Sequence, residues 1–283
     1  MAELVFTKLQ GNGNDFILVD EFEHELIPEE LKAKFASLYT ERRFGIGADG
    51  ILFLSKGEKA PLKMRVFNPD ESEAEMCGNG IRCLAKYIVD KGYEKYLMVS
   101  GFSKDSFPVE TMAGVIQVST KYGEDEEFTA TIGMPAPKFN RSEIPAIGEG
   151  EYREEIMENT VYAVNTGVPH AVVFVDEVGA VEMAELAPAI RNHHTFLTGT
   201  NVNFVEKRGE NLLHIRTYER GVEAETLSCG TGAMASAAVA RKLGMVGDTV
   251  HVETVGGPLT VRLGEKNEME GPARTVFTGS LEL

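Results

Sequence analysis

The chain has 283 residues, 43% hydrophobic and 25% charged, which are proportions typical of a globular protein rather than a disordered or fibrous one. Acidic residues (44) exceed basic ones (28), and the formal net charge of −16 disfavours binding to nucleic acid or anionic lipid. No apolar run reaches membrane-helix length and the first ten residues lack a signal-peptide pattern, so we expect a cytoplasmic protein. The three cysteines, an odd number, fit reduced thiols better than a disulfide framework.

Short alternating segments bounded by turn residues predict strands through most of the chain. In chain order the sequence predicts strands at 4–9 and 16–20, a helix at 27–39, strands at 51–54 and 62–67, a helix at about 78–90, strands at 115–119, 160–164 and 171–175, a helix at 182–191, a strand at 212–218, a helix at 230–244 and strands at 249–254 and 259–263. This mixture indicates an α+β (mixed α/β) fold with many strands around a few helices. The acidic stretch 123–128 fits either a crossing between two halves or the tip of a solvated hairpin.

An internal repeat is the most informative feature of the sequence. ESEAEMCGNGIRCLAKYIVDKG and EAETLSCGTGAMASAAVARKLG lie 152 residues apart, and each contains Cys-Gly-x-Gly, a glutamate four residues before the cysteine and a glycine fifteen residues after it. The matching pairs are Glu73 with Glu225, Cys77 with Cys229, and Gly92 with Gly244. The repeat indicates a duplicated domain with one thiol in each half. We expect an N-terminal lobe of residues 1–124, completed by a C-terminal strand at 271–283, and a C-terminal lobe of residues 125–270.

Each repeated cysteine precedes glycines and a helical pattern, so both thiols are expected at helix amino termini. There the helix dipole lowers the pKa of a thiol, and backbone amides flanked by glycine bind carboxylates. Two such motifs facing each other across a cleft could place one sulfur on either side of an α-carbon. One thiolate would then remove a proton and the opposite thiol would deliver another, which inverts the carbon. The third cysteine, Cys83, has no counterpart and is predicted to lie in the core.

With these motifs in place, the chain resembles the diaminopimelate epimerases, PLP-independent isomerases that interconvert LL- and meso-diaminopimelate, over essentially its whole length. The resemblance rests on GNGNDF (11–16), RRFGIGADG (42–50), FNPDESEAEMCGNGIRC (67–83), NTGVPHAV (165–172), NVNF (201–204) and YERGVEAETLSCGTGA (218–233). It implies two pseudo-symmetric domains, each a strongly curved, barrel-like sheet around a central helix, with the active site in the cleft between them. It also implies a homodimer that acts on a small molecule in lysine biosynthesis, with no cofactor and no metal.

The resemblance implies roles for particular residues. Cys77 and Cys229 match the proton donor and acceptor pair, and His170 and Glu219 match auxiliary residues near them. The residues matched to substrate binding are Asn14, Asn68, Gly78, Asn79, Asn201, Glu219, Arg220, Gly230 and Thr231, of which Gly78, Asn79, Gly230 and Thr231 would cradle the carboxylate at the reacting carbon. Asparagines and an arginine suit a ligand with an amino acid at each end, since they accept from ammonium groups and donate to carboxylates.

Two positions depart from the family pattern. Many bacterial members carry glutamine where this chain has Gly50, and asparagine where it has Val168. Those two side-chain contacts to the substrate therefore do not carry over.

Other functions fit parts of the sequence. A proline racemase-like two-cysteine racemase is the alternative among isomerases, while Cys77 with His170 also fits a cysteine hydrolase or peroxidase, and the whole chain fits a catalytically silent amino-acid-binding protein. The glycines of residues 45–50 do not indicate NAD binding, because a helix pattern precedes them and a strand follows. His193 and His194, being adjacent, are expected to point apart and predict no metal site.

Overall fold

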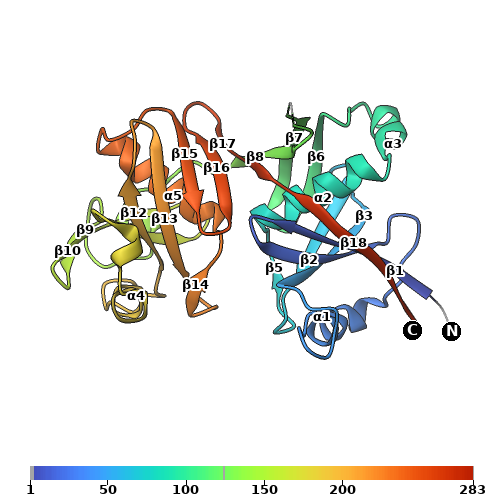
Figure 1. Cartoon of the computed structure of the whole chain (residues 1–283), viewed down its shortest axis with the longest axis horizontal. Coiled ribbons are helices and arrows are strands. Elements are labelled where there is room, and N and C mark those ends of the chain that lie inside the picture. Colours follow the sequence, from blue (N-terminus) through green and yellow to red (C-terminus); the bar gives the residue numbers. More distant parts are fainter. Residues whose placement is uncertain (1–2, 124, 283) are drawn as a thin grey trace. The chain divides into compact units, whose positions relative to one another are not determined.

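A computed structural model describes residues 3–123 and 125–282. The chain folds into two compact units, one formed by Met1–Ile132 with Gly271–Leu283 and the other by Gly133–Glu270. Figure 1 shows one long helix among the strands of each unit. Strands dominate and helices are few, which confirms the expected α+β class.

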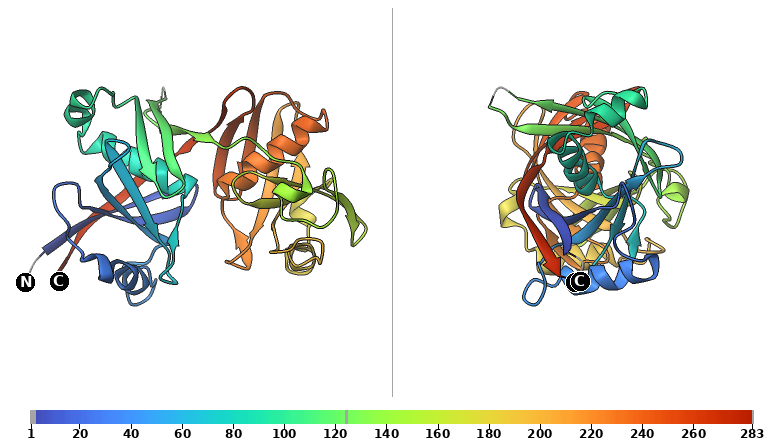
Figure 2. Two further views of the ribbon diagram at one scale, coloured as in Figure 1. Left: turned by 180° about the vertical axis from the view of Figure 1, so that it is seen from behind. Right: turned by 90° about the vertical axis from the view of Figure 1, so that its right-hand side faces the viewer.

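The first unit is a sheet with helices on and within it. Its elements are β1 (Glu3–Gly11), β2 (Asn14–Asp20), η1 (Glu29–Leu31), α1 (Lys32–Tyr39), β3 (Gly50–Lys56), β4 (Leu62–Phe67), β5 (Glu73–Ala74), α2 (Gly78–Asp90), α3 (Glu94–Val99), β6 (Ser106–Thr111), β7 (Gly114–Tyr122), β8 (Phe128–Met134) and β18 (Arg274–Glu282). β1 pairs antiparallel with β2 and with β18, and Figure 2 shows β1, in blue, and β18, in red, side by side. β2 runs parallel to β3, β3 antiparallel to β4, and β4 antiparallel to β5 and parallel to β6. β6, β7 and β8 continue as an antiparallel series.

The second unit repeats this order of strands. Its elements are η2 (Arg141–Glu143), β9 (Arg153–Ile156), β10 (Asn159–Asn165), β11 (Pro169–Phe174), η3 (Val178–Ala180), α4 (Met183–Arg191), β12 (Asn201–Lys207), β13 (Leu212–Glu219), β14 (Ala224–Thr226), α5 (Gly230–Lys242), β15 (Thr249–Thr254), β16 (Gly257–Arg262) and β17 (Asn267–Pro272). β10 pairs antiparallel with β9 and β11, and β11 runs parallel to β12. β12 is antiparallel to β13, which is antiparallel to β14 and parallel to β15, and β15, β16 and β17 are antiparallel.

Each pairing of the second unit therefore has a counterpart in the first. The parallel pairs β2 with β3 and β4 with β6 correspond to β11 with β12 and β13 with β15. In both units a short strand, a cysteine and a long helix follow each other in the same order. The internal repeat thus extends over a whole unit and not only over the segment around each cysteine.

The helices α2 and α5 form the centre of their units. α2 packs against β1, β2, β3, β4 and β18, and α5 packs against β10–β13, β15 and β16. From Gly232 to Ala240 every residue of α5 is buried, and most are alanine or smaller, which lets the surrounding strands approach closely. Cys83 on α2 is 0% exposed, which confirms its predicted place in the core, and burial raises the pKa of its thiol.

Comparison with the predicted elements separates strong patterns from weak ones. The helices expected at about 78–90 and from residue 230 are confirmed as α2 and α5, whereas the one expected at 27–39 begins as a 3-10 turn. The sequence patterns missed α3 and the strands β5, β6, β8, β9, β12, β14 and β17, whereas the C-terminal strand expected at 271–283 is confirmed as β18. Several of these are very short, and others alternate poorly, such as β17, which reads NEMEGP.

The acidic stretch 123–128 lies at the turn of a hairpin. Tyr122 of β7 pairs with Phe128 of β8, and the N–H of Gly123 donates to the carbonyl of Glu127 over 2.9 Å. Of the two interpretations of this stretch, the described residues match the hairpin tip; residue 124 lies outside them. None of the helices within 3–123 and 125–282 has the length and apolar character needed to cross a membrane.

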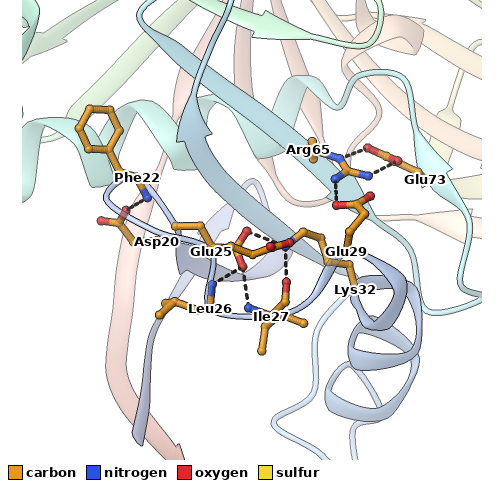
Figure 3. Close-up of polar contacts among 10 residues, drawn as sticks. Asp20, Phe22, Glu25, Leu26, Ile27, Glu29, Lys32, Arg65 and Glu73 are labelled. Carbon is orange, nitrogen blue, oxygen red and sulfur yellow. Dashed lines mark hydrogen bonds and ion pairs between the residues drawn. The ribbon is translucent and has the colours of Figure 1, made fainter. Parts of the chain in front are cut away.

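A buried ion pair fastens the segment between β2 and α1. The Oε2 atom of Glu21 accepts from Lys32 Nζ over 2.6 Å, and its Oε1 atom accepts from the backbone N–H groups of Leu26 and Ile27 over 3.0 and 2.8 Å. Lys32 also donates to the carbonyl of Ile27, beside which Figure 3 places it. Both charged side chains are almost fully buried, at 6% and 4% exposure, so each depends on the other for its solvation.

Candidate functional site

Both repeated cysteines occupy the N-cap positions of the helices that follow them. Cys77 is the N-cap residue of α2 and Cys229 that of α5, each with extended backbone. The N–H of Gly80 donates to Cys77 Sγ over 3.4 Å, and the structure records no disulfide at the cysteines that it describes. Each sulfur therefore lies at the positive end of a helix dipole, beside N–H groups that suit a carboxylate, as the sequence predicts.

A repeated ion pair positions the segment before each cysteine. In the first unit Arg65 donates from Nε and Nη2 to the two carboxylate oxygens of Glu73, over 2.6 and 2.8 Å, and Figure 3 shows this fork. In the second unit Arg216 makes the same bidentate pair with Glu225, at 2.6 Å for both bonds. The two glutamates of the repeat thus tie the short strands β5 and β14 to their neighbours β4 and β13, and so fix where each helix begins.

The second unit surrounds its cysteine with a hydrogen-bond chain whose directions are determined. The Nδ2 atom of buried Asn203 lies 3.0 Å from the carbonyl of Ala171, which only accepts, so the same nitrogen faces His170 Nδ1 at 3.0 Å. Thr217 completes this arrangement by donating to Asn203 Oδ1 over 3.0 Å. Because Nδ1 of His170 accepts, its Nε2 atom carries the proton and donates to Thr231 Oγ1 over 2.9 Å.

The hydrogen-bond chain from Asn203 ends at the sulfur of Cys229. Thr231 Oγ1, which accepts from His170, lies 3.4 Å from Cys229 Sγ and can donate its own proton to that sulfur when the sulfur is a thiolate. Complete burial, with a smaller contribution from the charge of Arg220, lowers the pKa of His170 to about 3, so the imidazole is neutral near pH 7. A donor directed at the sulfur stabilises its anionic form, and this part of the site therefore suits a thiolate.

The first unit surrounds its cysteine differently. Asn14 Oδ1 accepts from Asn79 Nδ2 over 3.1 Å and lies 3.9 Å from Cys77 Sγ. Asn14 Nδ2 donates to Asp49 Oδ2 over 2.6 Å. Cys77 consequently faces an amide oxygen, which only accepts, whereas Cys229 faces a hydroxyl.

Asn201 and Arg220 are neighbours in the second unit. Asn201 Oδ1 accepts from the backbone N–H of Arg220 over 2.9 Å, and its Nδ2 donates to the carbonyl of Pro169 over 3.0 Å. The guanidinium of Arg220 donates to the carbonyl of Thr198 over 3.2 Å. The structure thus brings these two predicted site residues together, close to His170, whose pKa the charge of Arg220 affects.

Asn68 and Glu219 occupy equivalent positions. Each lies three residues after the arginine of the repeated ion pair, at the end of β4 or β13. Asn68 Nδ2 donates to Ser72 Oγ over 2.9 Å, and Glu219 Oε1 accepts from Thr226 Oγ1 over 2.5 Å. Both side chains therefore lie in the turns that lead to the cysteines.

Sheet register explains one departure from the family pattern. In the parallel pair β2 with β3, Phe16 stands opposite Gly50; in β11 with β12, His170 stands opposite Asn201. Gly50 is thus the counterpart of Asn201. A side chain at position 50 would meet the carbonyl oxygen of Phe67 at 3.0 Å, so the backbone leaves little room for one.

The second departure follows the same relationship. Asn14 stands two residues before Phe16, as Val168 stands two residues before His170. Two pairs of equivalent positions are thus related, Gly50 with Asn201 and Asn14 with Val168. In each pair one unit has an asparagine and the other has a glycine or an apolar residue.

Sequence reasoning missed several residues that hold this site. Asn203 contacts His170 and Asp49 contacts Asn14, while Thr217 holds Asn203, and none of these three residues was among the candidates. Asn201 and Asn203 are two residues apart in a strand and so share a face of the sheet, which is the signal that could have identified Asn203.

The expectation that His193 and His194 point apart is wrong. Their ring centroids lie 4.3 Å apart with the rings tilted by 49°, and burial together with the charge of His194 lowers the pKa of His193. No group of three or more His, Cys, Asp or Glu side chains among the described residues is arranged to hold a metal ion.

The chain matches the family profile described as diaminopimelate epimerase at residues 6–137 and 162–276. A diaminopimelate epimerase of Methanothrix thermoacetophila is 53% identical over 281 residues, covering 99% of this chain and 96% of the relative. Those of Archaeoglobus fulgidus and Bacillus cytotoxicus are 45% and 40% identical, covering 99% and 100% of this chain and 97% and 98% of the relatives.

Solved structures share the fold at low sequence identity. A phenazine biosynthesis protein of the PhzF family from Bacillus anthracis superposes with a TM-score of 0.73 at 17% identity, covering 100% of both chains. A hydroxyproline epimerase from Agrobacterium vitis superposes with a TM-score of 0.65 at 17% identity, covering 99% of this chain and 91% of that one. Taken with the family match and the relatives that are 40% identical or more, the chain belongs to the diaminopimelate epimerase family.

Proposed function

We propose that this protein epimerises diaminopimelate between its LL and meso forms, by removing a proton from one α-carbon and returning a proton to the opposite face. One observation carries the proposal: a duplicated unit presents a cysteine, Cys77 or Cys229, at the same helix amino terminus twice. Relatives that are 40% to 53% identical are named diaminopimelate epimerases, which supports diaminopimelate as the substrate.

In this reaction one cysteine acts as thiolate base while the other, as thiol, donates its proton. Only the singly ionised pair is competent, and the roles exchange when the reaction runs in reverse. The α-carboxylate is held by the first N–H groups of α2 and α5, at Gly78 with Asn79 and at Gly230 with Thr231. These amides also stabilise the negative charge that develops on the α-carbon and its carboxylate as the proton leaves.

The remaining predicted residues bind the amino and distal groups of the substrate. Asn14, Asn68 and Asn201 offer both donors and acceptors, Arg220 offers a cation to a carboxylate, and Glu219 offers an acceptor to an ammonium group. His170 serves the reaction indirectly, by orienting Thr231 next to Cys229.

The two-thiol chemistry requires no PLP. In the proposed reaction each unit serves as one lobe and supplies one of the two cysteines. We place the enzyme in lysine biosynthesis and in the cytoplasm; the odd number of cysteines fits a reducing compartment. A homodimer is supported by exposed apolar residues on two paired strands, namely Val5 of β1 with Val276 and Phe277 of β18, which are 46% to 56% exposed.

The test is incubation of the pure protein with LL-diaminopimelate in deuterated water. We expect meso-diaminopimelate carrying one solvent deuterium at the inverted α-carbon. If a parallel incubation with L-proline incorporated label and that with diaminopimelate did not, the proline racemase-like alternative would be favoured. Absence of label from both, with hydrolysis or binding alone, would reject an epimerase.

A further inference from the structure

Arg82 is the largest of the fully buried side chains, and it lies on α2 five residues after Cys77. Its hydrogen bonds run to neutral acceptors: Nη2 donates to Asn12 Oδ1 and Asn79 Oδ1, both over 2.8 Å, and Nε donates to the carbonyl of Pro272 over 3.3 Å. Burial lowers the pKa of Arg82 to about 10, so it remains a cation near pH 7. A buried cation supported by neutral groups is expensive for the fold, which calls for a role other than stability.

The contacts of Arg82 continue through two predicted site residues to a carboxylate. Arg82 donates to Asn79 Oδ1 over 2.8 Å, and Asn79 Nδ2 donates to Asn14 Oδ1 over 3.1 Å. Asn14 Nδ2 then donates to Asp49 Oδ2 over 2.6 Å. Asp49 is itself held by Arg42 Nη2, at 2.7 Å from its other oxygen. A cation, two amides and an anion are thus joined head to tail.

The charges at the two ends determine how both amides are turned. A guanidinium only donates, so the oxygen of Asn79 must face Arg82 and its nitrogen must face Asn14. A carboxylate only accepts, so the nitrogen of Asn14 must face Asp49 and its oxygen is left facing Asn79 and Cys77. Rotating either amide by 180° would oppose two donors or two acceptors at both of its ends.

Arg82 also holds the turn that precedes Asn14. Asn12 and Gly13 form the two-residue loop between β1 and β2, with φ values of 53° and 79°. Both residues lie in the left-handed region, as this type of hairpin requires. By bonding to Asn12, the guanidinium fixes the position of the backbone from which the Asn14 side chain extends.

The second unit lacks this device. The position equivalent to Arg82 is Met234, which is also fully buried, and the positions equivalent to Asn79 and Asn14 are Thr231 and Val168. The two units therefore share the fold, whereas the hydrogen-bond chain from Arg82 to Asp49 is found in the first unit only.

We propose that Arg82 and Asp49 are positioning residues that hold the Asn79 and Asn14 amides in a single orientation, from opposite ends of one hydrogen-bond chain. The inference rests on the proposed function, in which both asparagines bind the substrate beside Cys77. Their fixed orientation means that the substrate meets donors and acceptors already aligned for the transition state.

The kinetic test uses substitutions at both ends of the chain. Arg82→Lys keeps the cation but removes the fork, and Asp49→Asn keeps the shape but lets the amide of Asn14 turn either way. We expect each to lower kcat/KM for LL-diaminopimelate by about tenfold to a hundredfold. Met234→Leu and Asp248→Asn are the matched controls, in the equivalent buried position and in an exposed ion pair, and should change kcat/KM by less than about twofold.

Double-mutant cycles separate positioning from a general effect on folding. In an Asn79→Ala background, Arg82→Lys should reduce kcat/KM by less than about threefold further, because the residue through which it acts is already gone. The same holds for Asp49→Asn in an Asn14→Ala background. Losses that multiply in full would overturn the proposal.

A second readout needs no activity. In NMR spectra of the substrate-free protein, Arg82→Lys should shift or broaden the side-chain NH2 signals of Asn14, although the two residues are not in contact. Met234→Leu should leave those signals unchanged. Unchanged Asn14 signals in Arg82→Lys would refute the proposed hydrogen-bond coupling between Arg82 and Asn14. This result does not depend on whether the wild-type protein epimerises diaminopimelate, so it is separate from a failure of the proposed function.

Discussion

The Nε2 atom of His170 lies 2.9 Å from the hydroxyl of Thr231, and that hydroxyl lies 3.4 Å from the sulfur of Cys229. Since Asn203 donates to the other ring nitrogen, His170 must donate to Thr231, which leaves the Thr231 proton available to a Cys229 thiolate. A neutral, fully buried imidazole thereby supports a hydrogen bond to a cysteine that it does not itself contact.

Thr231→Val should lower kcat/KM for epimerisation by about tenfold to a hundredfold. Valine keeps the shape of threonine but removes the donor to Cys229, and a hydrogen bond to a charged group contributes about 1.5 to 3 kcal/mol. Steady-state kinetics with LL-diaminopimelate give the loss. Thr129→Val is the control, because the Thr129 hydroxyl is buried and finds no hydrogen-bond partner within the described part of the chain. Equal kinetics for the two variants would contradict the role of Thr231.

The burial of His170 predicts that stability falls with pH below about 6.5. The pKa of His170 drops from an ordinary 6.5 to about 3 on folding. Between these two values the unfolded chain binds a proton at His170 and the folded protein does not. Above pH 6.5 neither state binds it, and the group has no effect. Between pH 7.5 and 5.0 this single group should remove about 2 kcal/mol from the free energy of unfolding.

Urea unfolding of wild type and His170→Gln at both pH values isolates that contribution. The substitution should reduce the drop in stability between pH 7.5 and 5.0 by about 2 kcal/mol. His251→Gln, at an exposed position on β15, should leave the drop nearly as in wild type. An unchanged drop in His170→Gln would mean that the imidazole protonates in the folded state.

Gly232→Ala should disturb the hydrogen-bond chain through His170 at its Asn203 end. A Cβ atom at residue 232 would clash with Asn203 Oδ1 and come within 3.3 Å of Thr217 Oγ1, so the amide that fixes the His170 tautomer would have to move. We expect kcat/KM to fall by about tenfold or more. Gly133→Ala is the control because a Cβ there would meet nothing within 4 Å. Full activity in Gly232→Ala would show that Asn203 can shift without consequence.

Cys77→Ala and Cys229→Ala should each abolish epimerisation, because one thiol cannot serve both faces of the α-carbon. The natural control is Cys83→Ala, which removes the third thiol from the core and should affect stability rather than turnover. Conversion of LL- to meso-diaminopimelate, followed by chiral chromatography, measures the effect. Turnover near that of wild type in either of the first two variants would eliminate the two-base mechanism.

The sequence predicted what local chemistry determines. The glycines after Cys77 and Cys229, with the apolar residues behind them, were sufficient to place two helix starts correctly. Asn12 with Gly13 is likewise a strong hairpin signal, and it positions Asn14. What the sequence could not reveal is the burial of Arg82, because arginine is mostly exposed and only the packing of α2 against the strands around it removes this one from water.

The proton direction in the His170 chain also lay beyond the sequence. It depends on whether an acceptor such as the Ala171 carbonyl lies beside Asn203, and that follows from the register of β11 against β12. Similarly, Gly50 and Asn201 become equivalent only when the two parallel strand pairs are aligned. Tertiary register, rather than composition or spacing, carries this information.

The ion pair of Glu21 with Lys32 should stabilise the first unit without affecting catalysis. Lys32→Met leaves the Glu21 carboxylate buried with backbone donors but no cation, and removing one member of a buried pair costs about 3 to 5 kcal/mol. Lys34→Met, on the same helix, removes an exposed pair with Glu71 at 3.5 Å and should cost less than about 1 kcal/mol. Chemical denaturation measures both changes.

The double substitution Glu21→Gln with Lys32→Met sharpens this prediction. Glutamine can still accept from the N–H groups of Leu26 and Ile27 through its amide oxygen, and it leaves no buried charge. The double variant should therefore recover part of the stability lost in Lys32→Met alone, a coupling that additive contributions cannot produce. If the two losses simply add, the stabilising effect of Lys32 comes instead from its contact with the Phe53 ring, over which its ammonium lies at 4.6 Å.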